Sequence, residues 1–491
     1  MKKDVAIIGA GFSGLSAACS LAKEGYNVTI FEKNKELGGR ARSLDLEGFY
    51  FDMGPTWYWM PDVFENFFNK FGKKVSDYYS LERLDPGYGI YFGENDYLEI
   101  PESLSKLKTL FEDLEPGSAS KLEKFLKDAE YKYQVGINEL VHKPGVSLLE
   151  LANVKLIYKA IRLNVFQSFH NYIRKYFSHP KIIQILEFPI LFLGAMPENT
   201  PALYSLMNYA DIVLGTWYPK GGMSVIPIAM ADLAKELGVE LKLNANIDKI
   251  NVENGVGKSI SINGENQTFD IIIGSADYNH VEQQLLDEEF RTYTKKYWEK
   301  RTMAPSSLIF YLGVNKKLKK MGHHNLFCDE DLRVFANEIY THPQWPSKPL
   351  FYTSCSSKSD STTAPEGCEN LYILMPVAPG IIDTDEIREK YYNLIMERIE
   401  KITGENVKDH VIVKKSYSLK EFVNDYNSFK GNAYGLANTL FQTANLKPSL
   451  KSKKVENLFF TGQLTVPGPG IPPTIISGQV VAKQIIKEYP L

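Results

Sequence analysis

The sequence predicts a multidomain α/β protein, and three observations lead to this prediction. The chain has 491 residues, about three times the usual domain size, so two or three interlocked domains are expected. Hydrophobic residues make up 44% of the chain and charged residues 23%, which is the balance of an ordered globular protein. Near the amino terminus, β-branched runs alternate with glycines and a helical pattern, which is the order of parallel strands joined by a helix.

The first βαβ unit is predicted over residues 4–32. Residues 4–8 form a buried strand that leads directly into the glycine-rich turn Gly9–Gly14. A helix follows over residues 15–24 and stops at a glycine, and residues 27–31 form the second strand, which ends at an acid. A strand before the glycines, a helix after them and a terminal acid together predict a Rossmann-type site for an adenine dinucleotide.

Each position of this turn has a physical role. Gly9 permits the tight turn, Gly11 lets the backbone approach a diphosphate, and Gly14 lets the helix pack on the strand. The helix amino terminus supplies N–H donors and the positive end of a dipole. Glu32 can accept hydrogen bonds from ribose hydroxyls and would repel a 2′-phosphate.

A second glycine motif favours FAD over NAD. Leu37-Gly-Gly-Arg40-Ala-Arg42 gives a second close backbone approach and a cation near the diphosphate, which suits the longer cofactor. With this motif the chain resembles the flavoprotein amine-oxidase superfamily. The run Phe51–Trp57 resembles the strand and turn that pass beside the isoalloxazine in that superfamily. No second GxGxxG motif occurs, so a separate NAD(P) domain is not expected.

Two later segments complete the predicted FAD domain. The second segment begins with a turn over residues 218–223, which a helix over 224–237 follows. After it we expect a strand over 239–243, short strands over 249–251 and 258–262, and a buried strand over 269–275. By resemblance, the part around Ile247 reaches the adenine side. The third segment, 455–478, contains a strand that ends at Gly462, a Pro/Gly loop, and a helix over 475–487. The amino terminus of that helix could bond a flavin carbonyl or a phosphate.

The carboxy-terminal loop narrows the resemblance. A strand ending in Thr-Gly, followed by Pro-Gly-x-Gly-Ile-Pro and a small-residue helix, resembles the bacterial phytoene-desaturase type of carotenoid desaturase. Residues 53–68 look like the sequence after the flavin strand in that family, and 361–367 resemble its Asp-Pro-Ser-x-Ala-Pro-x-Gly loop with a partly altered pattern. The resemblance runs from Lys3 to Ile486.

The resemblance implies one non-covalently bound FAD and identifies the residues expected to hold it. Asp52, beside the flavin strand, could act as a base, but an acid there more often bonds the backbone, so no catalytic residue is assigned. The expected cofactor-binding residues are Gly9, Ala10, Gly11, Ser13, Gly14, Glu32, Lys33, Gly38, Gly39, Arg40, Gly54, Pro55, Thr56, Trp57, Ile247, Gly462, Gly470, Ile471 and Pro472.

The predicted domains are discontinuous in the sequence. Residues 1–74, 216–299 and 431–491 are assigned to a Rossmann-type FAD-binding domain. Residues 300–430, with parts of 75–130, are assigned to an α+β substrate domain, since they include strands over 308–312 and 371–376 and a helix over 384–403. Residues 131–215 are expected to be a helical, membrane-facing insertion.

The resemblance also implies a reaction. A desaturase of this type removes two hydrogens from neighbouring carbons of an apolar polyene, either by phytoene-type desaturation or by 3,4-desaturation of a hydroxylated or monocyclic carotenoid. The electron acceptor would be oxygen or a quinone. Two alternatives stay open: an FAD-dependent carotenoid isomerase and an amine oxidase of the same superfamily. A non-catalytic carotenoid- or lipid-binding protein that keeps FAD is a third.

Composition excludes several other classes. The net charge of −3 does not provide the positive field that nucleic-acid binding needs. The four cysteines include no CxxC pair, and no cluster has the ligand spacing of a metal site; His323-His324 is read as part of a solvated loop. The longest apolar run, 182–196, is too short and too polar to span a bilayer. We therefore expect a cytoplasmic, peripherally membrane-associated protein without a metal.

One segment suggests how the membrane could be contacted. Between Leu151 and Leu186 the charges before Glu187 are all basic: Lys155, Lys159, Arg162, Arg174, Lys175 and Lys181. Apolar residues, among them Phe169, Tyr172 and Ile173, occur at helical spacing in the same segment. The pattern fits either a core-facing helix with a solvated basic face or a helix that lies in an anionic membrane interface, and the substrate class favours the second interpretation.

Overall fold

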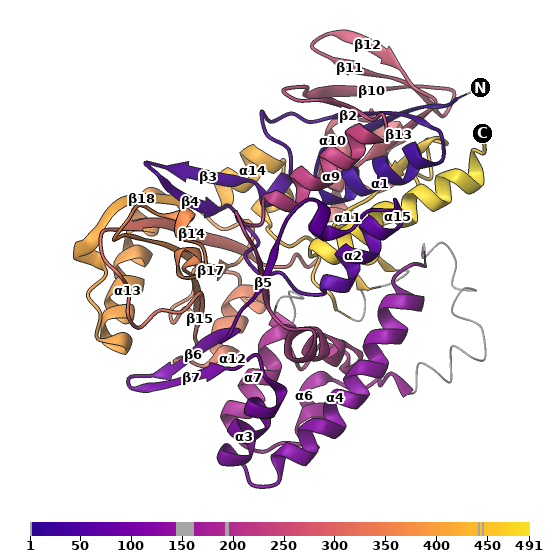
Figure 1. Cartoon of the computed structure of the whole chain (residues 1–491). Helices are drawn as coiled ribbons and strands as arrows, with labels where there is room; N and C mark the ends of the chain where they lie inside the picture. Colours follow the sequence, from indigo (N-terminus) through magenta and orange to yellow (C-terminus); the bar gives the residue numbers. More distant parts are fainter. Residues whose placement is uncertain (1, 144–161, 192–195, 440–441, 444–445) are drawn as a thin grey trace.

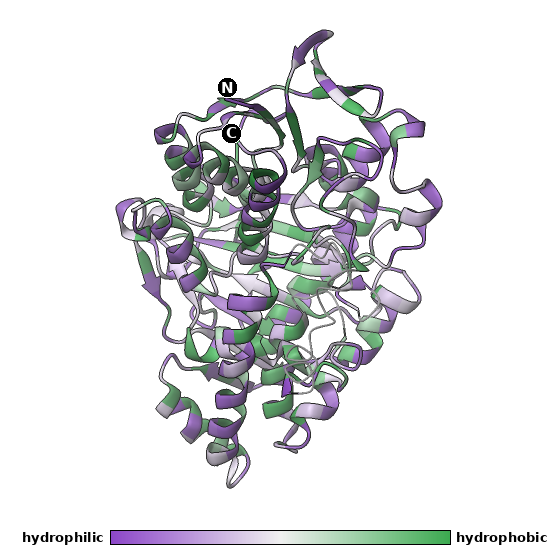
Figure 2. Ribbon diagram, turned by 90° about the vertical axis from the view of Figure 1, so that its right-hand side faces the viewer, coloured by the Kyte–Doolittle hydropathy of each residue, from purple (hydrophilic) through white to green (hydrophobic). Residues whose placement is uncertain are grey.

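The computed structural model describes residues 2–143, 162–191, 196–439, 442–443 and 446–491 of the chain. Two large sheets lie side by side in it, and a group of helices lies below them in Figure 1. Both termini are close together beside the parallel sheet (Figure 1). In Figure 2, hydrophobic segments gather toward the middle of the molecule and hydrophilic ones toward its outer turns.

The first large sheet is parallel and has the order β19-β13-β1-β2-β9. Its inner strands are continuous apolar runs buried on both faces, as expected for a parallel sheet covered by helices. Residues from all along the chain meet in it, so its domain is discontinuous. The bounds are β1 (Asp4–Ile8), β2 (Asn27–Phe31), β9 (Glu240–Lys242), β13 (Ile271–Gly274) and β19 (Leu458–Phe460).

Helices α1 (Phe12–Lys23), α9 (Val225–Glu236) and α15 (Ile471–Glu488) pack together beside this sheet. A Cβ on Gly478 would lie 2.3 Å from the carbonyl oxygen of Ser13, so glycine is what lets α15 lie so close to α1. The predicted start of the last helix at residue 475 is wrong. The helix begins at Ile471 because its two prolines occupy the first turn, where a missing N–H costs nothing.

The second large sheet is mixed, with the order β18-β14-β17-β16-β15-β6-β7. One of its faces packs on α13 (Asp385–Thr403) through residues such as Phe310 and Ile395, and the other face turns toward the parallel sheet. The strands are β6 (Tyr88–Gly93), β7 (Asp96–Ile100), β14 (Ser306–Val314), β15 (His324–Phe327), β16 (Phe351–Ser354), β17 (Glu369–Val377) and β18 (Val411–Tyr417).

The interpretation of His323-His324 as part of a solvated loop is wrong. Both side chains are buried, and His324 is the first residue of β15, where it pairs with Ser354. The polar neighbours that suggested a loop, from Asp329 onward, come after the strand has ended. Within the described residues, no group of His, Cys, Asp and Glu side chains could hold a metal ion.

The helical group contains the helices within 104–135, 169–191 and 206–208. The helices are α3 (Leu104–Leu114), α4 (Ser118–Val135), α6 (Phe169–Ile173), α7 (Pro180–Leu191) and α8 (Leu206–Asn208). No helix among the described residues has the length and apolar character needed to cross a bilayer.

The expected apolar membrane face of segment 151–186 is wrong for its described part. Residues 151–161, with Lys155 and Lys159, lie outside the described residues. Beyond them, Phe169, Tyr172 and Ile173 are buried in the main hydrophobic core, where Phe125 of α4 packs against Tyr172. The interpretation as a core-facing helix therefore holds for α6, and Phe166, which is 88% exposed, is the apolar exception.

Smaller elements connect these layers. Three short antiparallel strands form a separate sheet above the parallel one (Figure 1). They are β10 (Ile247–Glu253), β11 (Val256–Ile262) and β12 (Glu265–Thr268). The hairpin β3 (Ser43–Leu46) and β4 (Phe49–Asp52), the pair β5 (Leu81–Arg83) and β8 (Trp217–Pro219), and the helices α2 (Pro61–Asn69), α10 (Tyr278–Gln284), α11 (Lys295–Glu299), α12 (Leu332–Ala336) and α14 (Leu419–Tyr426) complete the described fold.

Candidate active site

A cavity of about 260 Å³ lies between the two large sheets. One side is formed by the carboxyl ends of β1, β2, β13 and β19, where parallel α/β sheets bind ligands. The other side is formed by β14 and β17, through residues such as Ile309 and Leu374.

Most of the residues predicted to hold a cofactor line this cavity. They are Gly9, Gly11, Ser13, Glu32, Lys33, Gly38, Gly39, Arg40, Gly54, Pro55, Ile247, Gly462, Gly470 and Ile471. Ala10, Gly14, Thr56, Trp57 and Pro472 do not line it. The structure thus brings together residues from three distant segments of the sequence.

The first glycine turn is arranged for a ligand. Gly9 has a φ of 109° and donates its N–H to the carbonyl of Phe31 at 2.8 Å, which joins the turn to β2. A Cβ on Gly14 would lie 2.2 Å from the Gly9 carbonyl oxygen, so that glycine serves the packing of α1. A Cβ on Gly11 would meet nothing within 4 Å. Because no protein atom requires glycine at Gly11, its small size leaves space for a bound group.

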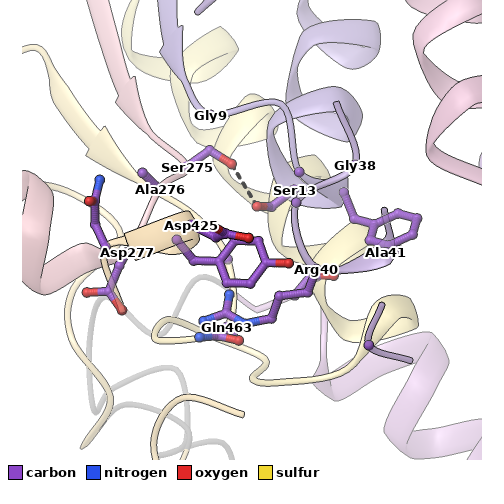
Figure 3. Close-up of a pocket in the computed structure, with 18 of the residues that line it drawn as sticks. Gly9, Ser13, Gly38, Arg40, Ala41, Ser275, Ala276, Asp277, Asp425 and Gln463 are labelled. Atoms are coloured by element: carbon purple, nitrogen blue, oxygen red, sulfur yellow. Dashed lines mark hydrogen bonds between the residues drawn. The ribbon is translucent and has the colours of Figure 1, made fainter. Parts of the chain in front are cut away.

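Side chains fix this turn to its neighbours. The Ser13 hydroxyl is 2.8 Å from the Ser275 hydroxyl, a contact drawn in Figure 3. The Glu32 carboxylate is buried and accepts hydrogen bonds from the Ala10 N–H at 2.9 Å and the Asn34 N–H at 3.0 Å. Glu32 is thereby held at the carboxyl end of β2, where a ribose would lie beside a diphosphate on Gly11.

Arg40 supplies a cation with an unused donor. It donates to the Ser428 hydroxyl at 2.7 Å and lies over the Tyr426 ring at 5.0 Å. Its Nε is buried and has no hydrogen-bond partner in the described part of the chain, and burial lowers the pKa of Arg40. Figure 3 shows Arg40 beside Gln463 in the cavity wall. A buried guanidinium N–H without an acceptor fits a diphosphate oxygen in this space.

Other charges on this side are balanced among themselves. Burial raises the pKa of Asp277 to about 6, while Arg40 and backbone N–H groups oppose the shift. Burial and the neighbouring Lys33 lower the pKa of His280 to about 4, so His280 is neutral near pH 7. Arg42, the second arginine of the glycine motif, forms an ion pair with Asp425 at 2.6 Å and does not line the cavity.

The loop after β19 forms an end wall. The Ser477 hydroxyl accepts from the Gly462 N–H at 3.1 Å and from the Thr461 hydroxyl at 2.9 Å, which fixes the start of the loop against α15. Pro469, Gly470 and Ile471 then line the cavity at the amino terminus of α15. Because Pro472 and Pro473 have no N–H, the Ile471 N–H is the backbone donor that the first turn of this helix places at the cavity for a carbonyl or an anion.

The side formed by the mixed sheet is apolar and aromatic. Ser307, Ile309, Tyr372, Leu374 and Tyr434 line it. The Tyr372 hydroxyl donates to the Gly54 carbonyl at 3.0 Å, and the Tyr311 hydroxyl donates to the Met53 carbonyl at 2.7 Å. These bonds hold the turn after β4 against the sheet, so the turn and the sheet face form one continuous wall.

Thr56 and Trp57 lie behind this wall. The Thr56 hydroxyl is 2.8 Å from the Tyr352 hydroxyl, which is also 2.5 Å from Nδ1 of His324. The Trp57 ring stacks on His324, with ring centroids 4.1 Å apart and an angle of 11° between the planes. The two residues therefore support the turn rather than line the cavity.

Asp52 bonds the backbone, which is the second of the two roles considered for it. Its carboxylate accepts the Met223 N–H at 2.7 Å and joins β4 to the start of α9, and it does not line the cavity. Burial raises the pKa of Asp52 to about 7, against the effect of the hydrogen bonds from Met223 and Ser224. Nothing in this geometry makes Asp52 a base for a ligand in the cavity.

Several lining residues have no motif in the sequence. Asp277 and His280 follow β13, and Asp425–Asn427 come from α14 in the predicted substrate domain. The strand 269–275 and its small-residue end were recognisable, and they could have indicated Ser275 and Ala276. Asp425–Asn427 carry no such signal, because only the tertiary fold brings α14 to the cavity. The open space at Gly11, the unpartnered Nε of Arg40 and the placement of Glu32 together fit FAD.

The sequence matches a family model described as "Flavin containing amine oxidoreductase" over residues 12–486. It is 38% identical over 487 residues to the carotenoid 3,4-desaturase of Haloarcula japonica, covering 99% of this chain and 98% of that protein. It is 30% identical to the 4,4′-diapophytoene desaturase of Staphylococcus haemolyticus, covering 99% of both chains. It is 29% identical to the zeta-carotene-forming phytoene desaturase of Myxococcus xanthus, covering 98% and 93%.

Solved structures share the fold at lower identity. An oxidoreductase from Methanosarcina mazei superposes with a TM-score of 0.64 at 15% identity, covering 98% of this chain and 100% of that one. Cyclohexylamine oxidase from Brevibacterium oxydans superposes with a TM-score of 0.59 at 14% identity, covering 99% of both. At these identities the likeness concerns the fold alone.

Proposed function

The chain belongs to the flavin-containing amine oxidoreductase family, and on that premise we propose that it introduces a double bond at the 3,4 position of a carotenoid. The assignment to the carotenoid desaturases, without regard to which bond is attacked, follows directly from the comparisons. The chain is an FAD-dependent carotenoid desaturase, an oxidoreductase that acts on CH–CH bonds of an apolar polyene, since it aligns over nearly its whole length with three desaturases of carotenoids or their precursors.

The single observation that supports the 3,4 position is the difference in identity among these relatives. The haloarchaeal 3,4-desaturase shares 38% of aligned residues, whereas the phytoene and diapophytoene desaturases share 29–30% over equal coverage. The alignment with the 3,4-desaturase covers 487 residues, so it includes both the FAD segments and the rest of the chain. The substrate side of the chain is therefore included in it.

The polar side of the cavity is suited to hold the cofactor. Gly11, Ser13 and the amino terminus of α1 would bind the diphosphate, with Arg40 as its cation, and Glu32 would bind the ribose. Bound FAD supplies the acceptor for the hydride that leaves the carotenoid. The amino terminus of α15, at Gly470 and Ile471, would orient the flavin ring through backbone N–H groups.

The apolar side is suited to hold the polyene. Ile309, Tyr372 and Leu374 present an apolar surface that excludes water from the reacting carbons. The lining residues of that side include no carboxylate or lysine among the described residues, so the chain positions the substrate and contributes little acid–base equipment. This suits a polyene, because existing double bonds stabilise positive charge at the carbon that loses the hydride.

Two alternatives predict different products. A carotenoid isomerase would use the same fold and would return a product of unchanged mass. An amine oxidase would need polar recognition of an amine, and the structural neighbours of that activity share only the fold with this chain.

The test is to supply the purified holoenzyme, in liposomes, with phytoene, γ-carotene or a 1-hydroxycarotenoid with a saturated C3–C4 bond. Loss of two hydrogens at C3–C4 supports the proposal. Desaturation of phytoene alone would move the chain to phytoene-type desaturation, and a product of equal mass would indicate an isomerase.

We also propose that the protein works at a membrane surface, because a long polyene must reach the cavity without crossing water. Among the described residues, Arg162 and Phe166 support this proposal. Arg162 is exposed and stacks on the Tyr131 ring at 3.7 Å, and Phe166 beside it is 88% exposed. An exposed aromatic side chain beside a cation is suited to an anionic headgroup region.

This surface can be tested without substrate. Replacing Lys155, Lys159 and Arg162 by glutamate, or Phe166 by serine, is expected to release the holoenzyme from anionic liposomes without changing its FAD content. Replacing Lys175, which bonds Gln167, by glutamine serves as a control at a neighbouring lysine. Unchanged sedimentation of the triple and Phe166 variants would place the membrane contact elsewhere.

A further inference from the structure

Lys447 is a buried lysine whose ammonium group has no partner. The residue is 6% exposed, and Nζ makes no hydrogen bond or ion pair with any residue that the structure describes. Burial lowers the pKa of Lys447 to about 7. A buried charge without a partner is costly, because water is removed and nothing in the protein replaces it. The arrangement therefore indicates that the charge of Lys447 acts on its surroundings from a distance.

A second unsatisfied polar atom lies at the same place. Asn438 is 3% exposed, and its Oδ1 has no hydrogen-bond partner. A Cβ on Gly468 would lie 3.2 Å from Nζ of Lys447 and 3.4 Å from Oδ1 of Asn438. Gly468 has a φ of 140°, so a side chain at this position would be strained as well as crowded. A donor and an acceptor thus face the same glycine from one side.

That glycine belongs to the end wall of the cavity. The next three residues, Pro469, Gly470 and Ile471, line the cavity. With neighbouring Cα atoms about 3.8 Å apart, Nζ of Lys447 lies within roughly 9 Å of the Cα of Pro469. Lys447 itself does not line the cavity, so its charge would act on a ligand through the loop and not by contact.

The other cations of the cavity are already balanced. Among the described lining residues the lysine and arginine side chains are Lys33 and Arg40, and three acids line the same cavity: Glu32, Asp277 and Asp425. Among the described residues no acid lies close enough to Lys447 to oppose the effect of its burial. No neighbouring negative charge therefore cancels the electrostatic field of the Lys447 ammonium group at the end wall. Inside a protein such a field is screened less than in water.

We propose that Lys447, in its protonated form, stabilises the negative charge that the bound flavin ring gains when it accepts a hydride. A hydride brings two electrons and one proton from the carotenoid, so the ring gains one negative charge. A cation beyond the end wall favours that charged form. Lys447 would act through its charge without touching the flavin or the substrate, so it is not a catalytic residue. The inference rests on FAD as the cofactor of the proposed function, and the identity of the carotenoid does not enter it.

The test is the midpoint potential of the flavin in the holoenzyme, measured without substrate. Lys447→Met is expected to weaken binding of the reduced flavin relative to the oxidised flavin about tenfold, which lowers the potential by about 30 mV. Lys447→Arg keeps the charge and is expected to stay near the wild-type value. Lys451→Met is the matched control, because Lys451 lies on the same segment and its Nζ pairs with Glu488 at 2.5 Å.

Two further measurements exclude a purely structural role. Sulfite forms a negatively charged adduct with oxidised flavin, so its affinity is expected to fall about tenfold in Lys447→Met and to be retained in Lys447→Arg. The thermal midpoint of Lys447→Met is expected to be equal to or above wild type, since the substitution removes an unpartnered buried charge.

A neutral variant, Met or Gln, that binds FAD and keeps the wild-type potential would overturn the inference. Loss of FAD from both neutral variants but not from Lys447→Arg would also overturn it, because Lys447 would then serve cofactor binding itself. A further outcome is that the wild-type protein lacks desaturase activity while its flavin potential still falls in Lys447→Met. That result would contradict the proposed function and leave the inference about Lys447 standing.

Discussion

The two sides of the cavity are built in different ways. The polar side consists of backbone turns and short motifs that are continuous in the sequence, and its side chains are fixed by hydrogen bonds such as those from Ala10 and Asn34 to Glu32. The apolar side includes Ile309 of β14 and Tyr372 and Leu374 of the paired strand β17, which meet because they share one face of the mixed sheet.

This difference separates the two tasks of the protein. The polar side recognises a dinucleotide through donors and charges, so losing one group there should weaken cofactor binding. The apolar side excludes water and shapes the space for a polyene, so introducing a charge there should stop turnover and leave the cofactor in place. Substitutions that affect only one of the two properties can therefore test the comparison.

The largest expected effect is on FAD binding in Gly11→Val. The Cβ position is open in the protein, so the fold should be retained while the side chain fills the space of the diphosphate. We expect FAD affinity to fall about a thousandfold, or about 4 kcal/mol, by fluorescence titration of the apoprotein. Gly93→Val is the matched control, because a Cβ there also meets nothing within 4 Å and Gly93 is outside the cavity. Equal FAD affinity in Gly11→Val would mean that the diphosphate lies elsewhere.

The next effect is on turnover, in Leu374→Glu. A carboxylate on the apolar side must be buried against the polyene, so we expect the rate to fall about a hundredfold while FAD content stays near wild type. Leu374→Met keeps the volume and apolar character and should retain most activity. If Leu374→Glu loses FAD instead, the two sides are not functionally separate and the comparison fails.

A smaller effect on cofactor binding is expected for Glu32→Ala. Loss of a charged hydrogen-bond acceptor should weaken FAD by roughly 1.5–3 kcal/mol, measured by the same titration. The Ala10 N–H also loses its acceptor, so part of this cost comes from the turn itself. Glu32→Gln keeps one acceptor oxygen, so its FAD affinity should lie between those of Glu32→Ala and the wild type. An unchanged FAD affinity in Glu32→Ala would mean that the ribose does not bind Glu32.

The smallest effect concerns stability and pH at the junction of the two sides. Burial raises the pKa of Asp52 to about 7, whereas the unfolded chain has the ordinary value of 3.8. The folded state therefore binds more protons between these values, and stability falls as pH rises from about 4 to 7. In Asp52→Asn this loss is absent, so its stability relative to wild type should rise by about 1–2 kcal/mol between pH 6 and pH 7.5 in urea unfolding. A pH-independent difference would contradict the buried carboxyl.

The same difference between the sides explains what the sequence could predict. The βαβ unit, the Gly-Gly-Arg motif and the carboxy-terminal loop depend on local turns, so the strands and most lining residues from Gly9 to Arg40 and from Gly462 to Ile471 were predictable. The start of α15 was misplaced because prolines were read as loop residues although they fit the first turn of a helix.

The remaining features depend on tertiary contacts. Thr56 and Trp57 follow the predicted flavin turn, but their side chains turn away to Tyr352 and His324. Asp425 and Tyr426 reach the cavity because α14 packs beside the glycine motif, where Arg42 pairs with Asp425. The apolar spacing around Phe169 indicated a face, but the sequence could not tell whether the protein core or a membrane covers it.

The most direct test of the central claim is an anaerobic single turnover of the holoenzyme with a liposome-borne carotenoid that has a saturated C3–C4 bond. We expect the flavin absorbance to be bleached in proportion to the substrate consumed, and each product molecule to have lost two hydrogens at C3–C4. Substrate conversion to a product of unchanged mass, or desaturation without flavin bleaching, would contradict the central claim.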